Sequence, residues 1–180
     1  MTKAALIDQM DAYLCALAVG DGASLNLSPN FRYSENGAFL AVGEGLWGRA
    51  PRFEGIQAFA DTETGQVVCM GVAFLDEQPR PFAQRLLVQD GALAEAETIV
   101  STDAKGHFAD VEQLLKPDIL YTAVVPPSRR VDRAGLREAA DRYWEGLEQS
   151  DGLIPRFNYR CDKYDNGAKT TNTLRTLLSP

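Results

Sequence analysis

The sequence predicts an α+β protein in which a curved antiparallel sheet forms a cone covered by helices, followed by a C-terminal helix–strand extension. Two observations support this prediction. Apolar residues recur at three- and four-residue spacing after Thr2, as in an amphipathic helix. Between residues 53 and 100, short runs typical of strands alternate with Gly-containing turns, as in an antiparallel meander. Because a one-faced sheet needs an apolar cover, we expect the early helix and a late helix to pack on its concave side.

Composition and charge favour one globular domain that binds neither nucleic acid nor membranes. The chain has 180 residues, of which 45% are hydrophobic and 24% charged. Its formal net charge of −7 opposes binding to phosphate-rich surfaces. The sequence shows no secretory signal and no apolar run of membrane-spanning length. Its three cysteines form no C-x-x-C pair, which predicts reduced, buried thiols in a cytoplasmic protein without a metal site.

The first elements follow from local signals. The opening helix is expected to end at Gly20-Asp21-Gly22, since glycine is the usual residue after a helix. A strand over residues 30–34 is closed by the tight turn Glu35-Asn36-Gly37, and residues 38–42 return antiparallel. Residues 44–47 are predicted to form a short turn or helix.

The meander is expected to contain four strands. A polar connection with Pro79 and Pro81 is predicted between its second and third strands, and the pair Asp90-Gly91 turns the third into the fourth. The predicted strands cover residues 53–60, 66–75, 82–89 and 92–100.

The chain is predicted to be a single domain, 1–180, with internal divisions. Residues 1–100 form the core cone, 101–131 an irregular connection interrupted by prolines, and 132–180 a repeated helix–strand unit. The repeat rests on a shift of 130 residues, which aligns residues 4–38 with 134–168 and gives ten identities. The alternative is that both segments merely share generic helix and Asn-Gly turn signals.

Four stretches within residues 1–100 are similar to the nuclear transport factor 2-like (NTF2-like) superfamily, which includes the SnoaL-like and ketosteroid isomerase-like domains. They are residues 13–17, 31–37, 43–47 and 90–100. The C-terminal unit, with residues 161–167, resembles an extension found in one uncharacterised branch of that group. The resemblance implies a cone with a deep pocket, usually in a homodimer or higher homo-oligomer.

The resemblance also implies a range of functions. Enzymes of the superfamily are commonly cofactor-free isomerases, dehydratases, cyclases, epoxide hydrolases and lyases, and one type eliminates formaldehyde from lignin-derived aromatic dimers. Other members only bind their ligands, so the fold does not decide the chemistry. The triplet Gly43, Gly45 and Gly48 superficially matches a dinucleotide fingerprint, but it does not follow a strand of a βαβ unit.

Five residues are candidates for catalysis. His107 can exchange a proton near neutral pH, although a loop histidine is also a common exposed residue. Arg32 can stabilise an oxyanion, and Glu35 can transfer a proton or lie in solvent beside its turn. Strand alternation separates Arg32 from Tyr33. Arg85 and Glu97 can pair across neighbouring strands, either inside the cone, where pKa values shift, or as ordinary surface charges.

Aromatic residues with a polar tip are the candidate walls of a substrate pocket, although core packing explains them equally well. They are Tyr13, Tyr33, Trp47, Tyr121 and Trp144. Together these features predict a cofactor-independent lyase that dehydrates, or eliminates formaldehyde from, a small hydroxylated hydrophobic molecule, most specifically a lignin-derived aromatic. The alternatives are an isomerase or cyclase of the ketosteroid isomerase-like type and a non-catalytic small-molecule-binding module.

Overall fold

The computed structural model describes residues 1–102, 109–116, 119–157 and 161–171. The chain divides into two compact units, which are described separately. The first unit comprises residues 1–117 and 164–170, and the second comprises 118–163 and 171–180. The hairpin near residue 166 belongs to the first unit, and the internal divisions at residues 100 and 131 stay a prediction.

The first unit opens with helix α1 (Lys3–Val19), as predicted. The Thr2 hydroxyl accepts a hydrogen bond from the backbone N–H of Ala5, which satisfies one of the free donors at the helix start. Gly20, with φ of 69°, ends the helix in the left-handed conformation. A 3-10 turn, η1 (Gly22–Ser24), then leads into the sheet.

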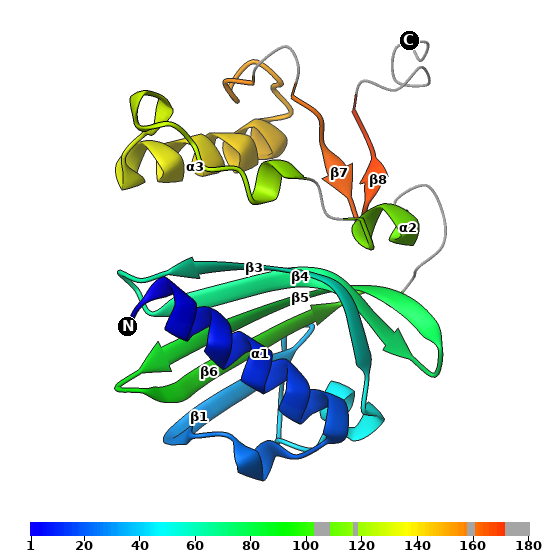
Figure 1. Cartoon of the computed structure of the whole chain (residues 1–180). Helices are drawn as coiled ribbons and strands as arrows, with labels where there is room; N and C mark the ends of the chain where they lie inside the picture. The colour runs from blue at the N-terminus through cyan, green and yellow to red at the C-terminus, as the bar shows by residue number, and fades with distance from the viewer. Residues whose placement is uncertain (103–108, 117–118, 158–160, 172–180) are drawn as a thin grey trace. The chain divides into compact units, whose positions relative to one another are not determined.

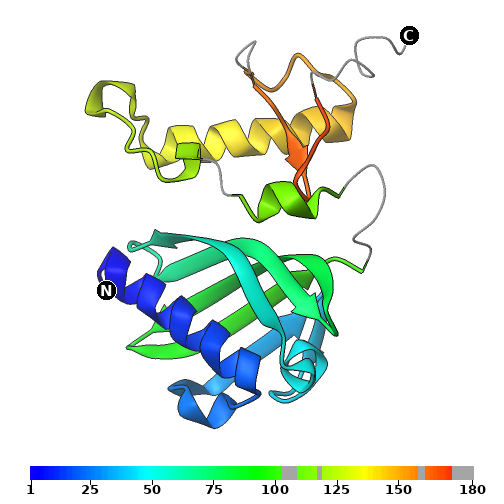
Figure 2. The same cartoon turned by 45° about the vertical axis from the view of Figure 1, so that its right-hand side comes forward.

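The sheet of the first unit has six strands in the order β2-β1-β6-β5-β4-β3. All neighbouring pairs in it are antiparallel except β1 with β6. Figures 1 and 2 show its strong curvature, with α1 lying across the inner face. The strands are β1 (Leu27–Glu35), β2 (Ala38–Leu40), β3 (Arg52–Asp61), β4 (Gln66–Leu75), β5 (Gln78–Gln89) and β6 (Ala92–Val100), and the 3-10 helix η2 (Gly45–Arg49) lies between β2 and β3. The predicted α+β class and curved sheet are confirmed.

One connection differs from the prediction. Strand β5 begins at Gln78, so Pro79 and Pro81 lie inside the strand, and the turn is formed by Asp76 and Glu77, both with positive φ. The Pro81 carbonyl accepts a hydrogen bond from Ser101, directly after the end of β6. The backbone groups of residues 79 and 81 therefore face the side away from β4. On that side β6 has already ended, so a missing N–H costs no hydrogen bond between strands.

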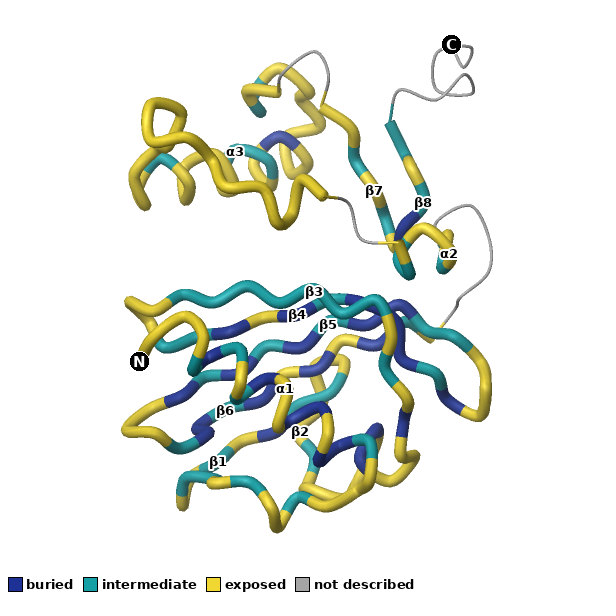
Figure 3. The backbone as a smooth tube through the Cα atoms, in the orientation of Figure 1, coloured by how far each residue is buried: buried dark blue, intermediate teal, exposed yellow. Residues whose placement is uncertain are grey.

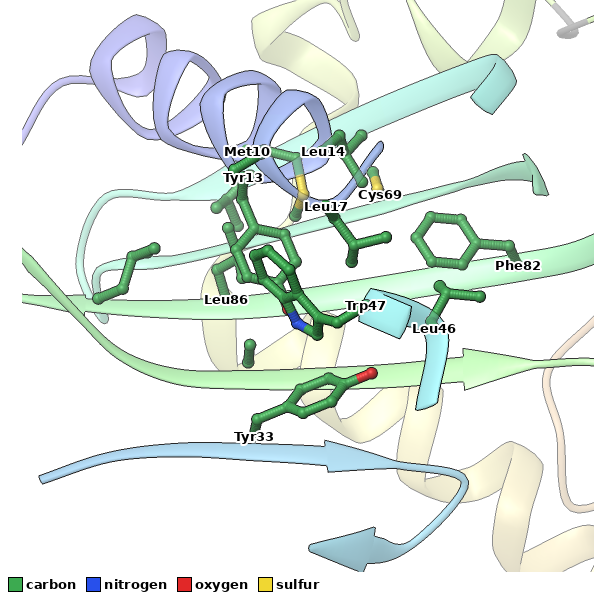
Figure 4. Packing of buried hydrophobic residues seen from close by; sticks show 14 of the residues in the cluster. Met10, Tyr13, Leu14, Leu17, Tyr33, Leu46, Trp47, Cys69, Phe82 and Leu86 are labelled. Atoms are coloured by element: carbon green, nitrogen blue, oxygen red, sulfur yellow. The ribbon is translucent and has the colours of Figure 1, made fainter. Parts of the chain in front are cut away.

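The inner face of the sheet forms the core together with α1 and η2. Burial alternates along the strands (Figure 3), with Phe82, Gln84 and Leu86 of β5 buried and the residues between them less so. Figure 4 shows side chains of α1 packed over this face beside Trp47. The predicted burial of the cysteines holds for Cys69, whereas Cys15 and Cys161 are exposed.

The first unit is completed by a short helix and a hairpin. Helix α2 (Val111–Leu114) contacts β4 and β5. Strands β7 (Tyr164–Asp165) and β8 (Ala168–Lys169) form the hairpin, and the Asn166 carbonyl accepts a hydrogen bond from Asp110. Gly167, with φ of 87°, approaches Asp110 so closely that a Cβ would collide with its carbonyl.

The second unit contains two 3-10 turns, η3 (Ile119–Tyr121) and η4 (Pro127–Arg129), and helix α3 (Arg133–Gln149). Helix α3 is capped by Asp132, whose side chain accepts from Gly135, and ends at Ser150 in the left-handed conformation. Its bounds lie 130 residues after those of α1, with N- and C-caps at the corresponding positions. Whether α3 covers the sheet stays a prediction.

Two neighbouring valines of β4 test the assignment of the core face. Val67 is 0% exposed and Val68 is 41% exposed. We expect Val67→Ala to lower the free energy of unfolding by about 2 kcal/mol more than Val68→Ala, because only Val67 leaves a cavity in the core, whereas both lose strand propensity. Urea unfolding followed by circular dichroism measures both variants. Equal losses would contradict the assignment.

Candidate functional site

The charged residues predicted from the strands form an ion-pair network on the face of the sheet opposite α1. Arg85 donates from Nε to Glu97 at 2.9 Å and from its terminal nitrogen to Glu95 at 2.9 Å. Arg32 also pairs with Glu95. The pairing of Arg85 with Glu97 across the ladder is therefore as predicted, but these side chains alternate with buried core residues and point away from the core.

This network is electrostatically satisfied. Hydrogen bonds from Arg85 and then Arg32 lower the pKa of Glu95, so the carboxylate stays charged near neutral pH and accepts a proton poorly. The Arg32 side chain is 64% exposed, whereas Tyr33 beside it is 2% exposed, which confirms that the two do not share a face. A catalytic role for Arg32, Arg85 or Glu97 stays a prediction.

The inner face carries a second set of polar groups, here called the inner polar cluster: Tyr13, Tyr33, Glu35, Trp47, Gln84 and Thr98. Glu35 is its carboxylate. Its Oε2 accepts a hydrogen bond from the Tyr33 hydroxyl at 2.6 Å and another from the backbone N–H of Leu46 at 2.7 Å. Glu35 is thus held at the end of β1 by a phenol and by η2, and it is not the freely solvated turn residue that its position in the sequence also allowed.

The position of the Glu35 carboxylate depends on a nearby glycine. Gly45 has φ of 59°, and a Cβ at this position would lie 2.5 Å from the Glu35 carboxylate oxygen. Glycine is therefore required on both conformational and steric grounds. The glycines of residues 43–48 thus have a structural explanation without a dinucleotide: they let η2 close over the end of β1 and present Leu46 N–H to Glu35.

Tyr13 and Trp47 supply two donors that the protein leaves unused. Their rings meet edge to face with centroids 5.3 Å apart, and both residues are at most 2% exposed. Within the described residues, the Tyr13 hydroxyl and Trp47 Nε1 are buried and make no hydrogen bond of ordinary geometry, although Trp47 and Thr98 lie close enough to Tyr13 to act as donors toward its oxygen. Buried polar groups are normally paired, and leaving one unpaired costs about 1–3 kcal/mol. These two adjacent donors are the candidates in this unit for binding an acceptor from outside the protein.

Both phenols of the cluster are held in the neutral form. Burial raises the pKa of Tyr13, and the Glu35 charge adds to this rise, whereas hydrogen bonding by Trp47 and Thr98 acts in the opposite direction. Burial and the hydrogen bond to Glu35 raise the pKa of Tyr33. The phenols are consequently O–H donors over the whole physiological range, and the Glu35 carboxylate is the acceptor for Tyr33.

Gln84 and Thr98 complete the inner polar cluster and are both buried. The Thr98 hydroxyl donates to Gln84 Oε1 at 2.6 Å, and Gln84 Nε2 donates to the Glu97 carbonyl at 3.0 Å. Sequence reasoning did not identify either residue. The signal was present, because each is the single polar residue within an alternating apolar set that also contains Phe82 and Leu86 or Ala96 and Val100.

The remaining predicted residues lie elsewhere. His107 is outside the described residues. Tyr121 and Trp144 belong to the second unit and are 49% and 65% exposed, and their role in a pocket stays a prediction. Tyr13, Tyr33, Trp47 and Glu35, by contrast, are brought together by α1, β1 and η2, as Figure 4 shows for the three aromatic side chains.

Comparison with known proteins leaves the function of the chain open. Residues 129–178 match the model of a domain of unknown function, DUF8021. No curated protein matches the chain. Within the described residues, each helix is too short or too polar to cross a lipid bilayer.

Several solved structures are similar to the chain. An NTF2-like protein of unknown function from Cytophaga hutchinsonii has 10% identity and a TM-score of 0.45, covering 53% of this chain and 89% of its own. A protein of unknown function with a cystatin-like fold from Methylobium petroleophilum has 13% identity and a TM-score of 0.47, covering 73% and 98%. A protein from Xanthomonas campestris, provisionally named a polyketide cyclase, has 16% identity and a TM-score of 0.45, covering 55% and 92%. Identities this low bear on the fold alone, so the site is understood from its own residues.

Two conservative substitutions test the unused donor. Without added ligand, we expect Tyr13→Phe to leave the free energy of unfolding unchanged or to raise it by about 1 kcal/mol, since it removes an unpaired buried hydroxyl. Tyr33→Phe should lower it by about 2 kcal/mol, because Glu35 loses a charge-assisted hydrogen bond. Chemical denaturation at neutral pH compares them. A larger loss for Tyr13→Phe than for Tyr33→Phe would show that the Tyr13 hydroxyl already has a partner.

Proposed function

We propose that the first unit binds a small hydrophobic molecule through an oxygen atom that accepts hydrogen bonds from Tyr13 and Trp47. The observation that supports this is the pair of buried donors without protein partners. Their surroundings are aromatic and aliphatic, including Met10, Leu86 and Phe82. Such a setting suits an apolar compound with one carbonyl, phenolic or hydroxyl oxygen.

The same arrangement supports proton-transfer chemistry without a cofactor. Neutral donors aimed at one oxygen stabilise negative charge that develops there, and a nearby carboxylate removes a proton from the bound molecule. Glu35 is the proposed base and Tyr13 with Trp47 the proposed oxyanion donors. This division of roles fits an isomerase or cyclase, in which a proton leaves carbon beside a carbonyl.

Elimination is the more specific version of this proposal. Glu35 would take the proton of a terminal hydroxymethyl group while the adjacent carbon–carbon bond breaks. The bond electrons form a new double bond and expel a benzylic hydroxyl, which leaves as water with a proton from a donor of the cluster. The products are formaldehyde, water and an alkene, so no oxidant or reductant is needed. A lignin-derived aromatic diol has the required groups.

Binding is tested first, with Trp47 as the reporter. The protein has two tryptophans, so Trp144→Phe leaves Trp47 as the only indole. We expect aromatic ketones and phenols to change its fluorescence and to raise the melting temperature. Matched hydrocarbons without the oxygen should bind more weakly, and Tyr13→Phe should reduce affinity for the oxygenated compounds about tenfold while sparing the hydrocarbons. Equal binding of both classes would contradict the proposed donor role.

Catalysis is tested by exchanging carboxylates on the two faces of the sheet. Glu35→Gln keeps an oxygen that can accept from Tyr33 and Leu46 but removes the base, so we expect ligand binding to persist and turnover to fall by about 10²–10⁴-fold. Glu97→Gln, on the outer face, is the matched control and should retain turnover. Formaldehyde release identifies elimination, and a rearranged product of unchanged mass identifies an isomerase. Loss of turnover in Glu97→Gln but not in Glu35→Gln would contradict Glu35 as the base and would indicate that the reaction takes place on the outer face.

A further inference from the structure

The described part of the second unit buries no hydrophobic side chain. Among the described residues, all of the buried hydrophobic side chains lie between Leu6 and Val100, in the first unit. Most of the large exposed hydrophobic residues lie instead in the second unit: Ile119, Leu120, Tyr121, Val124, Val125, Val131, Leu136, Trp144, Leu147, Leu153 and Phe157. An apolar surface of this extent marks a site of association.

Helix α3 concentrates this surface into one stripe. Leu136, Trp144 and Leu147 are 61%, 65% and 56% exposed and lie on one side of the helix, with Ala140 between them. The residues 130 positions earlier in α1, Leu6, Leu14 and Leu17, are at most 7% exposed. The same apolar pattern is thus buried within the first unit in α1 and exposed within the second unit in α3.

The charges beside the stripe indicate what covers it. At 100° per residue, Arg137 near the helix start and Glu148 near its end lie on the same flank of the stripe. In an antiparallel pair of identical helices, each flank meets the same flank of the partner. Arg137 of one copy then faces Glu148 of the other, twice, and the small Ala140 lies near the crossing point, where it permits close approach.

The other hydrogen-bonded pairs on α3 do not involve Arg137 or Glu148. Arg142 is occupied by Glu138 at 2.9 Å on the polar side of α3, and Glu145 accepts from Gln149 at 3.1 Å. Arg137 and Glu148 have no ion-pair partner within the described part of the chain. We propose that the chain forms a symmetric homodimer in which the α3 helices of two copies pair antiparallel through the stripe of Leu136, Ala140, Trp144 and Leu147.

Sedimentation of the full chain between about 5 and 500 µM tests this proposal, since a short helix pair is a small interface with modest affinity. We expect a monomer–dimer equilibrium. Trp144→Glu and Leu136→Glu should each raise the dissociation constant about thirtyfold or more, because they place a charge in the apolar centre. Gln149→Glu, on the opposite side of the helix, is the matched control and should leave the constant unchanged.

A charge exchange tests the partner and its direction. Arg137→Glu and Glu148→Arg should each weaken the dimer about three- to tenfold at low salt, and the double variant should recover the wild-type constant. Circular dichroism verifies that α3 stays helical in every variant. A chain that sediments as a monomer throughout, because its stripe is covered by its own sheet, overturns the proposal. So does a dimer that the stripe variants leave intact or that the double exchange fails to restore.

Discussion

The structure of the first unit depends on the contact between helix α1 and the concave face of the sheet. A sheet curved this strongly exposes an apolar hollow, and α1 fills it with Leu6, Met10, Tyr13 and Leu17, all 0% exposed. The sheet can curve because β5 and β6 and then β1 and β6 change register within their pairings. At one end of the sheet, η2 approaches β1 and buries Leu46 and Trp47.

The approach of η2 to β1 brings the inner polar cluster into the buried interior, where its hydrogen bonds act more strongly than in water. Glu35 lies beside the neutral phenol of Tyr33, and the backbone N–H of Leu46 holds it, next to Gly45 with its positive φ. In a low-dielectric interior, such fixed donors act strongly on an oxygen placed among them. The outer face shows a different arrangement, in which arginines and glutamates pair with one another.

Much of the first unit could be predicted from local sequence. Residues 66–75 and 92–100 have the predicted strand bounds, and the Glu35-Asn36-Gly37 turn was evident, because periodicity and turn chemistry act over a few residues. The direction in which the strands face was not predictable, since alternation defines two faces without saying which one a helix covers. That ambiguity left open whether Arg85 and Glu97 lie inside the cone or on its surface, and Gln84 and Thr98 were not identified. The start of β5 was missed because Pro79 and Pro81 are compatible with a strand only where one side lacks a neighbour.

The central claim is that Tyr13 and Trp47 hold their donors for an atom that does not belong to the protein. The two units differ in this respect: the first has an internal polar site to satisfy, and the second has an apolar stripe to cover. A crystal structure grown with an oxygenated aromatic compound tests the claim most directly. The account predicts density for a bound oxygen about 3 Å from both the Tyr13 hydroxyl and Trp47 Nε1. Density that shows both donors bonded to protein groups, with the compound bound elsewhere, would contradict it.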